Sequence, residues 1–362
     1  MPASDQVFAA SQTQEVGDAI AEVWERILGV PASRGDHLLD VLVNSHGMER
    51  SRQLGLLLSE IGVATGVSLP LTIAYESPSA AALTQMVQKG TWPHFQRPVR
   101  LQSGVGEPLF VLPGAGGLGL DVIMLVRYLT FPGPIFLNPP RGVDGDEPHR
   151  ALDAIVADHV AILRNIQPHG PYWLLGHSWG GLIALEIARV LRACGETIAF
   201  LGMIEPVVGE LDWTYRLWLE YMGKRFRYHL AELRQIGSPS AAARYVSKRL
   251  TPLFGRIGRL FGYNKWSGLA GAVGTLPGPL GAVVDAEIEL IDDYRLRYYD
   301  GAATLFATRA GHAADCDPEK IWPGKLRSFD LQWVEGNHES ILTEPGVKSL
   351  ARQVSASLAS HR

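Results

Sequence analysis

The stretch Gly176-His177-Ser178-Trp179-Gly180-Gly181 decides the fold of this chain of 362 residues. It contains the pattern G-x-S-x-G, in which a serine stands on a sharp turn between a strand and a helix. The apolar run YWLL at residues 172–175 predicts the strand, and the run LIALEIAR at residues 182–189 predicts the helix. Glycines leave room for the turn, and the helix N-terminus stabilises developing negative charge. The motif therefore predicts Ser178 as a nucleophile for acyl transfer.

Short apolar runs alternate with helical patterns after residue 107. Besides the strand before Ser178, we expect a helix at residues 151–165 and strands at residues 109–112, 135–137, 199–204, 303–307 and 331–334. This alternation is typical of a mostly parallel sheet with helices on both faces, so the predicted fold class is α/β. The alternation lapses between residues 207 and about 298. We expect a mostly helical insertion there, placed as a lid.

Residues 1–89 show helical periodicity instead. The segment at residues 14–28 carries six apolar residues on one face: Val16, Ile20, Val23, Trp24, Ile27 and Leu28. Two further periodic segments follow, one with Leu54, Leu57, Leu58 and Ile61 and one at residues 80–87. These patterns predict a small helical bundle at residues 1–89. The prolines and glycines of residues 90–106 predict a linker between the bundle and the α/β domain.

Composition and charge exclude several classes of protein. A net charge of −4 gives no electrostatic reason to expect nucleic-acid binding. Cys194 and Cys316 lie far apart and have no metal-ligand spacing, which fits a reducing compartment. The N-terminus lacks the pattern of a signal peptide, and the longest uncharged run, residues 266–284, is too rich in glycine for a membrane span. We therefore expect a cytoplasmic protein without a transmembrane segment and without a metal.

A nucleophilic serine needs a general base, and His338 occupies the expected position for it. It lies in Gly336-Asn337-His338-Glu339, after the last predicted strand and before a terminal helix. This matches the order nucleophile, acid, histidine that is typical of such sheets. His312 is the rival, but it falls just after the preceding strand. We therefore predict His338 as the base.

The acid that orients the histidine has two candidate positions. Glu205 directly follows the strand after the nucleophile helix, and its alternative role is that of a solvated turn residue before Pro206. Asp315 and Asp317 follow the next strand, where they could equally be loop or helix-cap residues. Either position can reach the same histidine from neighbouring strand ends.

The loop Pro113-Gly114-Ala115-Gly116-Gly117 follows the first predicted strand of the sheet and predicts half of an oxyanion hole. Such a site needs two backbone N–H groups aimed at the developing charge. We expect one from Trp179, directly after the nucleophile, and one from Ala115. The loop is a weak phosphate-binding signal, because no Lys-Ser/Thr pair follows the glycines.

Residues 107–362 resemble the type I thioesterase domains that end nonribosomal peptide and polyketide assembly lines. The resemblance rests on residues 110–117, 176–181, 201–206, 299–307 and 336–338. It implies an α/β-hydrolase fold, preceded by the helical bundle, and a thioesterase that releases a chain by hydrolysis or cyclisation. It also implies that the acid is Glu205, where the family usually has aspartate. Since glutamate is one methylene longer, the loop must retreat slightly, and Asp315 remains an alternative.

Residues 14–89 resemble a carrier protein domain of the same systems. The matching stretches are ILGVP at 27–31, DHLLD at 36–40, GVSLPL at 66–71 and YESPS at 75–79. Carriers attach phosphopantetheine to a serine in a G-G-H-S-L or G-x-D-S-L context, which is broken here. Counting from the right-hand landmarks gives Ser51, and counting from the left gives Ser45. The domain is either a divergent working carrier or a degenerate one kept for docking or structure.

The resemblance implies a substrate bound as a thioester to a carrier, and partners among upstream synthase modules or carrier proteins. Residues 216–260 are rich in Arg and Lys with aromatic residues between them. This stretch is a solvated face over an apolar stripe, a dock for an acidic carrier, or a site of attachment to an anionic membrane. Two alternatives to the thioesterase remain at this point: a carrier-independent esterase or lipase, and a non-catalytic acyl-carrying or docking module.

Overall fold

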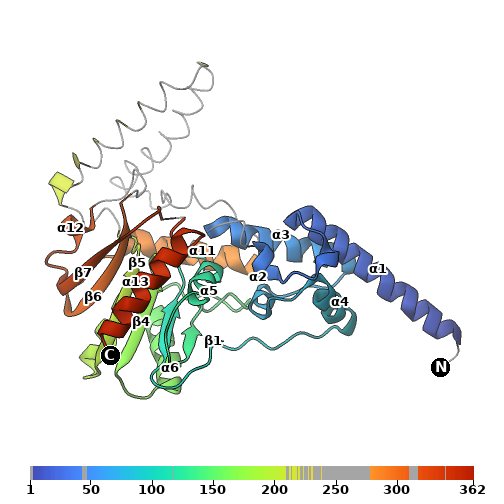
Figure 1. The fold of residues 1–362 in the computed structure, drawn as a ribbon, viewed down its shortest axis with the longest axis horizontal. Coiled ribbons are helices and arrows are strands. Elements are labelled where there is room, and N and C mark those ends of the chain that lie inside the picture. Colours follow the sequence, from blue (N-terminus) through green and yellow to red (C-terminus); the bar gives the residue numbers. More distant parts are fainter. Residues whose placement is uncertain are drawn as a thin grey trace.

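The structure of the protein is a computed structural model (Figure 1). It describes residues 3–42, 47–116, 118–208, 278–309, 317–338 and 340–362, with isolated positions between 212 and 238. A bundle of helices at the N-terminal end lies beside a sheet that is covered by helices on both faces. Most of the predicted lid, including most of its basic residues, lies outside the described residues.

The described strands form one seven-stranded sheet in the order β1-β3-β2-β4-β5-β6-β7. Neighbouring strands are parallel except for β1 and β3, which pair in the antiparallel direction. The central strands β2 and β4 are almost completely buried, as expected for a parallel sheet between two helical layers. The strand bounds are β1 Val99–Gln102, β2 Leu109–Leu112, β3 Ile135–Leu137, β4 Tyr172–His177, β5 Ile198–Ile204, β6 Tyr299–Thr308 and β7 Leu326–Val334.

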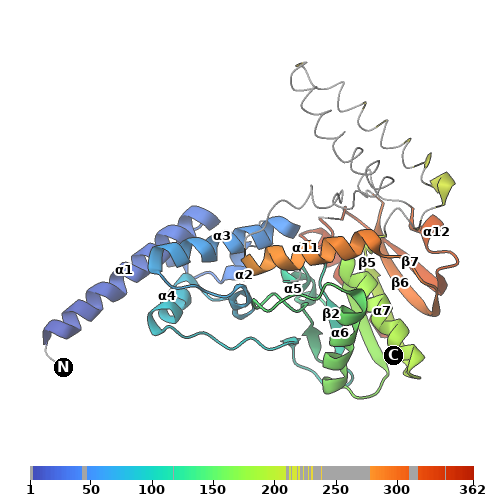
Figure 2. The same cartoon turned by 180° about the vertical axis from the view of Figure 1, so that it is seen from behind.

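Helices cover both faces of this sheet. Figure 1 shows α5 and α13 on the near face, and the reversed view in Figure 2 shows α6, α7 and α11. These helices are α5 Leu120–Val126, α6 Leu152–Ile166, α7 Trp179–Ala193, α11 Gly278–Asp293 and α13 Gly346–Ser360, with the short α12 Pro318–Ile321 before β7. The predicted α/β class is thereby confirmed. None of the described helices is both long enough and apolar enough to cross a membrane.

The predicted strands agree with the structure at their centres and differ at some ends. The strands expected at residues 109–112 and 135–137 have those bounds. Strand β6 begins at Tyr299, four residues before the predicted start at Ala303. Its first residues alternate between buried and exposed, so their polar side chains hid the strand from an apolar-run criterion.

The segment predicted as a linker contributes a strand to the sheet. Strand β1 lies within residues 90–106 and pairs with β3 through Val99 opposite Leu137 and Arg100 opposite Phe136. Val99 and Leu101 pack against the buried core, whereas Arg100 is exposed. The flanking prolines and glycines concealed this strand, which forms an edge of the sheet, the position where prolines are tolerated.

The N-terminal part is a helical bundle, as its periodicity predicts. It comprises α1 Ala3–Leu28, α2 Leu38–Val41, α3 Gly47–Thr65 and α4 Ala80–Lys89, with 3-10 helices at Ala32–Arg34 and Leu71–Glu76. The apolar residues that carried the prediction are buried, among them Ile20, Val23, Trp24, Leu54, Leu57, Leu58 and Ile61. Ser79 caps α4 because its hydroxyl accepts a hydrogen bond from the Ala82 backbone N–H at 3.3 Å.

Candidate active site

The predicted catalytic residues follow different strands of the sheet but lie along one edge of it. Ser178 follows β4, Glu205 follows β5, and His338 follows β7. The loop at residues 113–119 follows β2. Because these strands are parallel, their carboxyl ends meet at one edge, where ligands bind in open α/β sheets.

Ser178 has the strained backbone that the motif predicts. Its φ is 54° and its ψ is −121°, outside the regions that residues with a side chain usually occupy. The Ser178 N–H donates to the Ile204 carbonyl at 2.8 Å and ties the turn to the end of β5. A Cβ atom at Gly176 would lie 2.2 Å from the Gly180 carbonyl oxygen, so the turn requires glycine there. Such local strain is common at catalytic positions.

Glu205 and His338 meet beside this turn. The His338 Nδ1 atom lies 3.5 Å from Glu205 Oε2, and the two side chains are 27 % and 9 % exposed. This separation is longer than a tight charge-assisted hydrogen bond of about 2.8 Å. Contacts of this kind commonly tighten when substrate binds. The pair has the arrangement in which a carboxylate orients a general base.

The backbone around Glu205 accommodates the longer acid. Glu205 has a φ of 46°, and its N–H donates to the Phe306 carbonyl at 2.9 Å. Its Oε1 atom accepts a hydrogen bond from the Thr308 N–H at 2.5 Å. The other oxygen, Oε2, lies on the side of His338. One carboxylate oxygen is therefore fixed by strand β6 while the other contacts His338.

His177, directly before the nucleophile, is a site residue that the sequence did not single out. Its ring stacks on the ring of His338 with centroids 5.4 Å apart and planes 28° apart. Burial, with a smaller effect of the neighbouring His338, lowers the pKa of His177 to about 3. His177 therefore stays neutral at pH 7 and offers His338 an uncharged aromatic face. Its place within the G-x-S-x-G motif was the only available signal.

The predicted oxyanion loop lies against the nucleophile. A Cβ atom at Gly114 would lie 3.3 Å from Ser178 Cβ and 3.1 Å from His177 Nδ1, so the loop backbone comes close to both residues. Ala115 is the next residue of this loop. Trp179 is the first residue of α7, where backbone N–H groups have no partner within the helix. Both predicted donors therefore lie in segments next to Ser178.

The helix α7 is anchored by a polar network around the buried Glu186. The Trp179 ring packs edge-on against Tyr294, with centroids 6.0 Å apart. The Tyr294 hydroxyl donates to Glu186 Oε1 at 2.8 Å, and Arg297 pairs with the other oxygen of Glu186. Glu186 is buried, so its charge depends on these partners. The network fixes α7 against the segment that follows α11.

Glu287 on α11 is a second site residue that the sequence did not reveal. Its Oε2 atom accepts a hydrogen bond from the Gly116 N–H, in the oxyanion loop, at 2.8 Å. The residue is 5 % exposed, and burial raises its pKa to about 8, against the weaker opposing effect of the Gly116 N–H. At pH 7 this carboxyl is therefore mostly neutral. No sequence pattern connects residues 171 positions apart, so only the fold could place it here.

Of the remaining candidate residues, the structure describes Asp317 and Ser51. Asp317 is the N-cap of α12, where its side chain accepts from the Glu319 N–H at 3.0 Å. His312, Asp315 and Ser45 lie outside the described residues. Ser51 lies on α3 and is only 9 % exposed. Within the described parts of the chain, no group of three or more His, Cys, Asp or Glu side chains is placed to hold a metal ion.

The strand order, the turn at Ser178 and the Glu205–His338 pair together define an α/β-hydrolase. The family model of the thioesterase domain matches residues 107–358, and the chain belongs to this family. More particularly, it is a thioesterase domain of the type found in nonribosomal peptide and polyketide synthases. The resemblance stated from the sequence is thereby confirmed for the α/β part of the chain.

Known proteins with similar sequences are large synthases. Enterobactin synthase component F of Escherichia coli (strain K12) is 30 % identical over 254 residues, which span 70 % of this chain and 17 % of that protein. Indigoidine synthase of Dickeya dadantii (strain 3937) is 31 % identical over 152 residues, 41 % of this chain and 10 % of that protein. This chain therefore corresponds to a small fraction of the length of these relatives.

One solved structure extends the likeness over the helical bundle. A four-domain nonribosomal peptide synthetase bound to AMP and glycine aligns with 94 % of this chain and 26 % of its own length. The TM-score is 0.54 at 18 % sequence identity, so the likeness concerns the fold alone.

The Glu205–His338 pair leads to a prediction about the catalytic acid. Glu205→Gln keeps an acceptor for the Thr308 N–H but presents a neutral amide to His338. We expect thioester turnover to fall by at least about a hundredfold, because the histidine loses its orienting charge. Asp317→Asn, at the helix cap, is the control and should keep full activity. A fully active Glu205→Gln together with an inactive Asp315→Asn would assign the role to Asp315 instead.

The raised pKa of Glu287 predicts a pH-dependent stability. Its pKa is about 8 in the folded protein and about 4.5 as a free side chain. Between these values the folded state binds a proton that the unfolded state lacks. The free energy of unfolding therefore falls as pH rises, by roughly 1.4 kcal/mol per pH unit from this group.

Urea unfolding at pH 5.5, 6.5 and 7.5 measures this effect. Glu287→Gln keeps an acceptor for Gly116 without a charge, so its stability relative to wild type should increase at each higher pH. Glu289→Gln, an exposed acid on the same helix, should show no such trend. A constant difference between Glu287→Gln and wild type would contradict the prediction.

Proposed function

We propose that this protein is a serine thioesterase that releases an acyl or peptidyl chain from a phosphopantetheine thioester through an acyl-Ser178 intermediate. The observation that carries the proposal is the Glu205–His338 contact beside a serine with positive φ. Membership of the thioesterase domain family supports it independently.

In the acylation step, His338 accepts the hydroxyl proton of Ser178 while Oγ attacks the carbonyl carbon of the thioester. The carbonyl oxygen becomes negatively charged and is held by the N–H groups of Trp179 and Ala115. The C–S bond then breaks, and the leaving sulfur takes the proton from His338. The products are an acyl-serine ester and a free thiol.

In the deacylation step, His338 accepts a proton from the group that attacks the acyl-serine. Attack by water gives a carboxylic acid, and attack by a hydroxyl or amine of the chain itself gives a ring. In both cases the proton returns to Ser178 as its Oγ leaves. The carboxylate of Glu205 stabilises the imidazolium form of His338.

The nature of the leaving group separates this proposal from a simple esterase. The catalytic residues would serve both, since thioesters and esters react through the same tetrahedral intermediate. We expect the ratio of kcat to KM to be higher for an acyl-pantetheine thioester than for the matching ethyl ester. An enzyme that prefers the ester would instead be a carrier-independent esterase.

The nucleophile is tested directly with a fluorophosphonate probe. Wild type should gain the mass of one phosphonyl group, whereas Ser178→Ala should gain none and should lose thioester turnover. Alanine retains the Cβ atom and adds no bulk at the strained position, so the fold should be preserved. Ser340→Ala, in the turn after His338, keeps the nucleophile and should still be labelled. Full thioester turnover by Ser178→Ala would refute the acyl-serine mechanism.

The attachment of phosphopantetheine to the helical bundle is a separate question. Ser51 lies in the second turn of α3 with little exposure, and the preceding Arg50 is buried. This environment does not fit a serine that must receive a bulky phosphodiester. It favours the second interpretation of the bundle, as a carrier-like domain kept for docking or structure.

Incubation with coenzyme A and a phosphopantetheinyl transferase, followed by intact-mass measurement, tests this point. Because Ser51 is buried, we expect Ser51→Ala and wild type to give identical mass changes. Ser45→Ala is the matched control, since Ser45 is the other candidate. A mass gain in wild type that disappears only in Ser51→Ala would establish Ser51 as the attachment site.

A further inference from the structure

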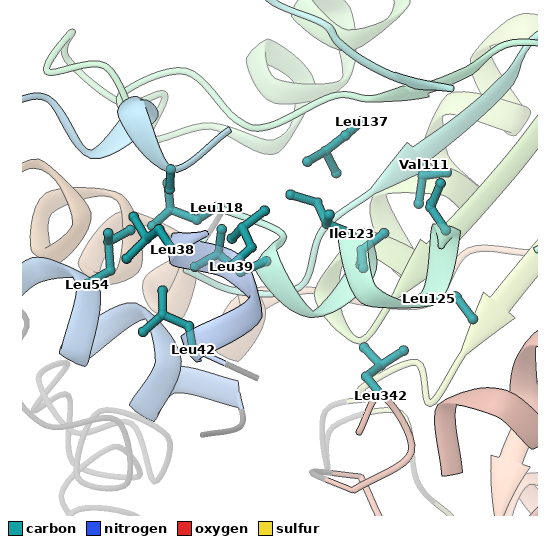
Figure 3. Packing of buried hydrophobic residues seen from close by; sticks show 14 of the residues in the cluster. Leu38, Leu39, Leu42, Leu54, Val111, Leu118, Ile123, Leu125, Leu137 and Leu342 are labelled. Atoms are coloured by element: carbon teal, nitrogen blue, oxygen red, sulfur yellow. The ribbon is translucent and has the colours of Figure 1, made fainter. Parts of the chain in front are cut away.

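The helical bundle and the sheet domain share one apolar core. Figure 3 shows Leu38, Leu39, Leu42 and Leu54 of the bundle beside Leu118, near the end of the oxyanion loop, and Ile123, on α5. All six side chains are buried and belong to a single cluster. The bundle therefore packs against the end of the oxyanion loop and the helix α5 that follows it.

An ion pair between a buried arginine and a half-buried aspartate crosses this boundary. Arg50 on α3 is 1 % exposed, and its Nη1 atom donates to Asp121 Oδ1 at 2.5 Å. Its Nε atom donates to the Leu42 carbonyl at 3.0 Å. Asp121 lies in the first turn of α5, two residues after the end of the oxyanion loop. A buried charge that lost its partner would be strongly destabilising, so this pair holds the two domains together.

A second polar contact reaches the same segment. The hydroxyl of Tyr75, in the bundle, donates to the Leu118 carbonyl at 3.0 Å. The Tyr75 ring stacks on Phe95 with centroids 5.5 Å apart. Burial raises the pKa of Tyr75, which keeps the hydroxyl protonated and able to donate. The ring is therefore fixed by packing, and the hydroxyl holds the loop backbone.

The oxyanion loop needs such external contacts. Its glycines lose more conformational entropy on ordering than other residues. An oxyanion hole works only when its N–H groups are held in place before the charge develops. The Leu118 N–H donates to the Gly116 carbonyl at 2.9 Å, which links the residue that Tyr75 contacts to the residue whose N–H donates to Glu287. Glu287, in the sheet domain, contacts the loop at Gly116. Tyr75 and Arg50, in the bundle, contact Leu118 and Asp121 near the C-terminal end of the loop.

We propose that the carrier-like bundle is a permanent part of the thioesterase, in which Tyr75 and Arg50 are positioning residues that hold the oxyanion loop in its active geometry. The proposal rests on the proposed function, because it assigns a catalytic purpose to that loop. A bundle that moved as a carrier would have to separate the Arg50–Asp121 pair and expose the shared core in every cycle.

The rate at which a small fluorophosphonate labels Ser178 tests this role without any carrier or acyl chain. Ser178 Oγ attacks phosphorus while His338 accepts the hydroxyl proton, fluoride leaves, and the phosphonyl oxygen occupies the oxyanion hole. We expect Tyr75→Phe to label about tenfold more slowly, since losing one oxyanion donor outright costs 10²–10³-fold. Thioester kcat should fall by a similar factor with KM unchanged. Tyr75→Phe keeps the ring and its stacking on Phe95, so the variant should fold.

The ion pair is tested with a double-mutant cycle. Arg50→Gln, Asp121→Asn and the double variant should all label Ser178 more slowly, and the double variant should be no slower than the worse single variant. The control is Arg26→Gln, which removes an exposed pair with Glu60 inside the bundle and should label at the wild-type rate. Circular dichroism and the Tm of each variant identify any that fails to fold.

Two outcomes separate this proposal from the proposed function. Wild-type labelling rates in folded Tyr75→Phe, with Ser178→Ala unlabelled, would overturn the positioning role and leave the serine mechanism intact. Absence of labelling in wild type would instead remove the serine mechanism itself. Slower labelling by Tyr75→Phe with an unchanged Arg26→Gln is the result expected if the bundle holds the loop.

Discussion

The strained turn at Ser178 is the constraint on which the active site depends. Its backbone conformation costs roughly 1–3 kcal/mol for a residue with a Cβ atom, so the turn persists only where the surrounding structure enforces it. The enforcement comes from the Ile204 carbonyl and from the close approach of Gly176 to Gly180. Because β4, β5 and β7 are parallel members of one sheet, the same edge then receives Glu205 and His338.

Burial sets the charge state of the groups around this turn. His177 is kept neutral next to His338, and Glu287 is kept largely neutral at the Gly116 N–H. Glu186 is buried as well but retains partners in Tyr294 and Arg297. A site of low polarity strengthens the interaction between the oxyanion and its N–H donors, because less water competes for them. The uncharged neighbours therefore suit the proposed reaction, in which negative charge develops at one position.

The contact between the bundle and the sheet domain gives the carrier-like fold a different physical meaning. Carrier and thioesterase domains that meet transiently need an interface that can open, whereas this one has a continuous apolar core and a buried Arg50 paired with Asp121. Interfaces of that kind resemble the interior of one domain. In the proposed arrangement, the bundle does not move as a carrier does but stays in a fixed position beside the oxyanion loop.

The sequence alone determined most of the elements, and it predicted Ser178 as the nucleophile of the proposed reaction. The G-x-S-x-G motif and the apolar runs predicted the strands and the turn at Ser178, because local periodicity and steric limits act over a few residues. The order of Glu205 and His338 along the chain predicted which strand ends they occupy. Strand β1 was missed, because prolines and glycines around a four-residue run suggest a linker. Only the tertiary structure placed Glu287 at Gly116 and Arg50 at Asp121, because these contacts join residues far apart in the chain and no local pattern encodes them. The burial of Ser51 likewise became visible only in the tertiary structure.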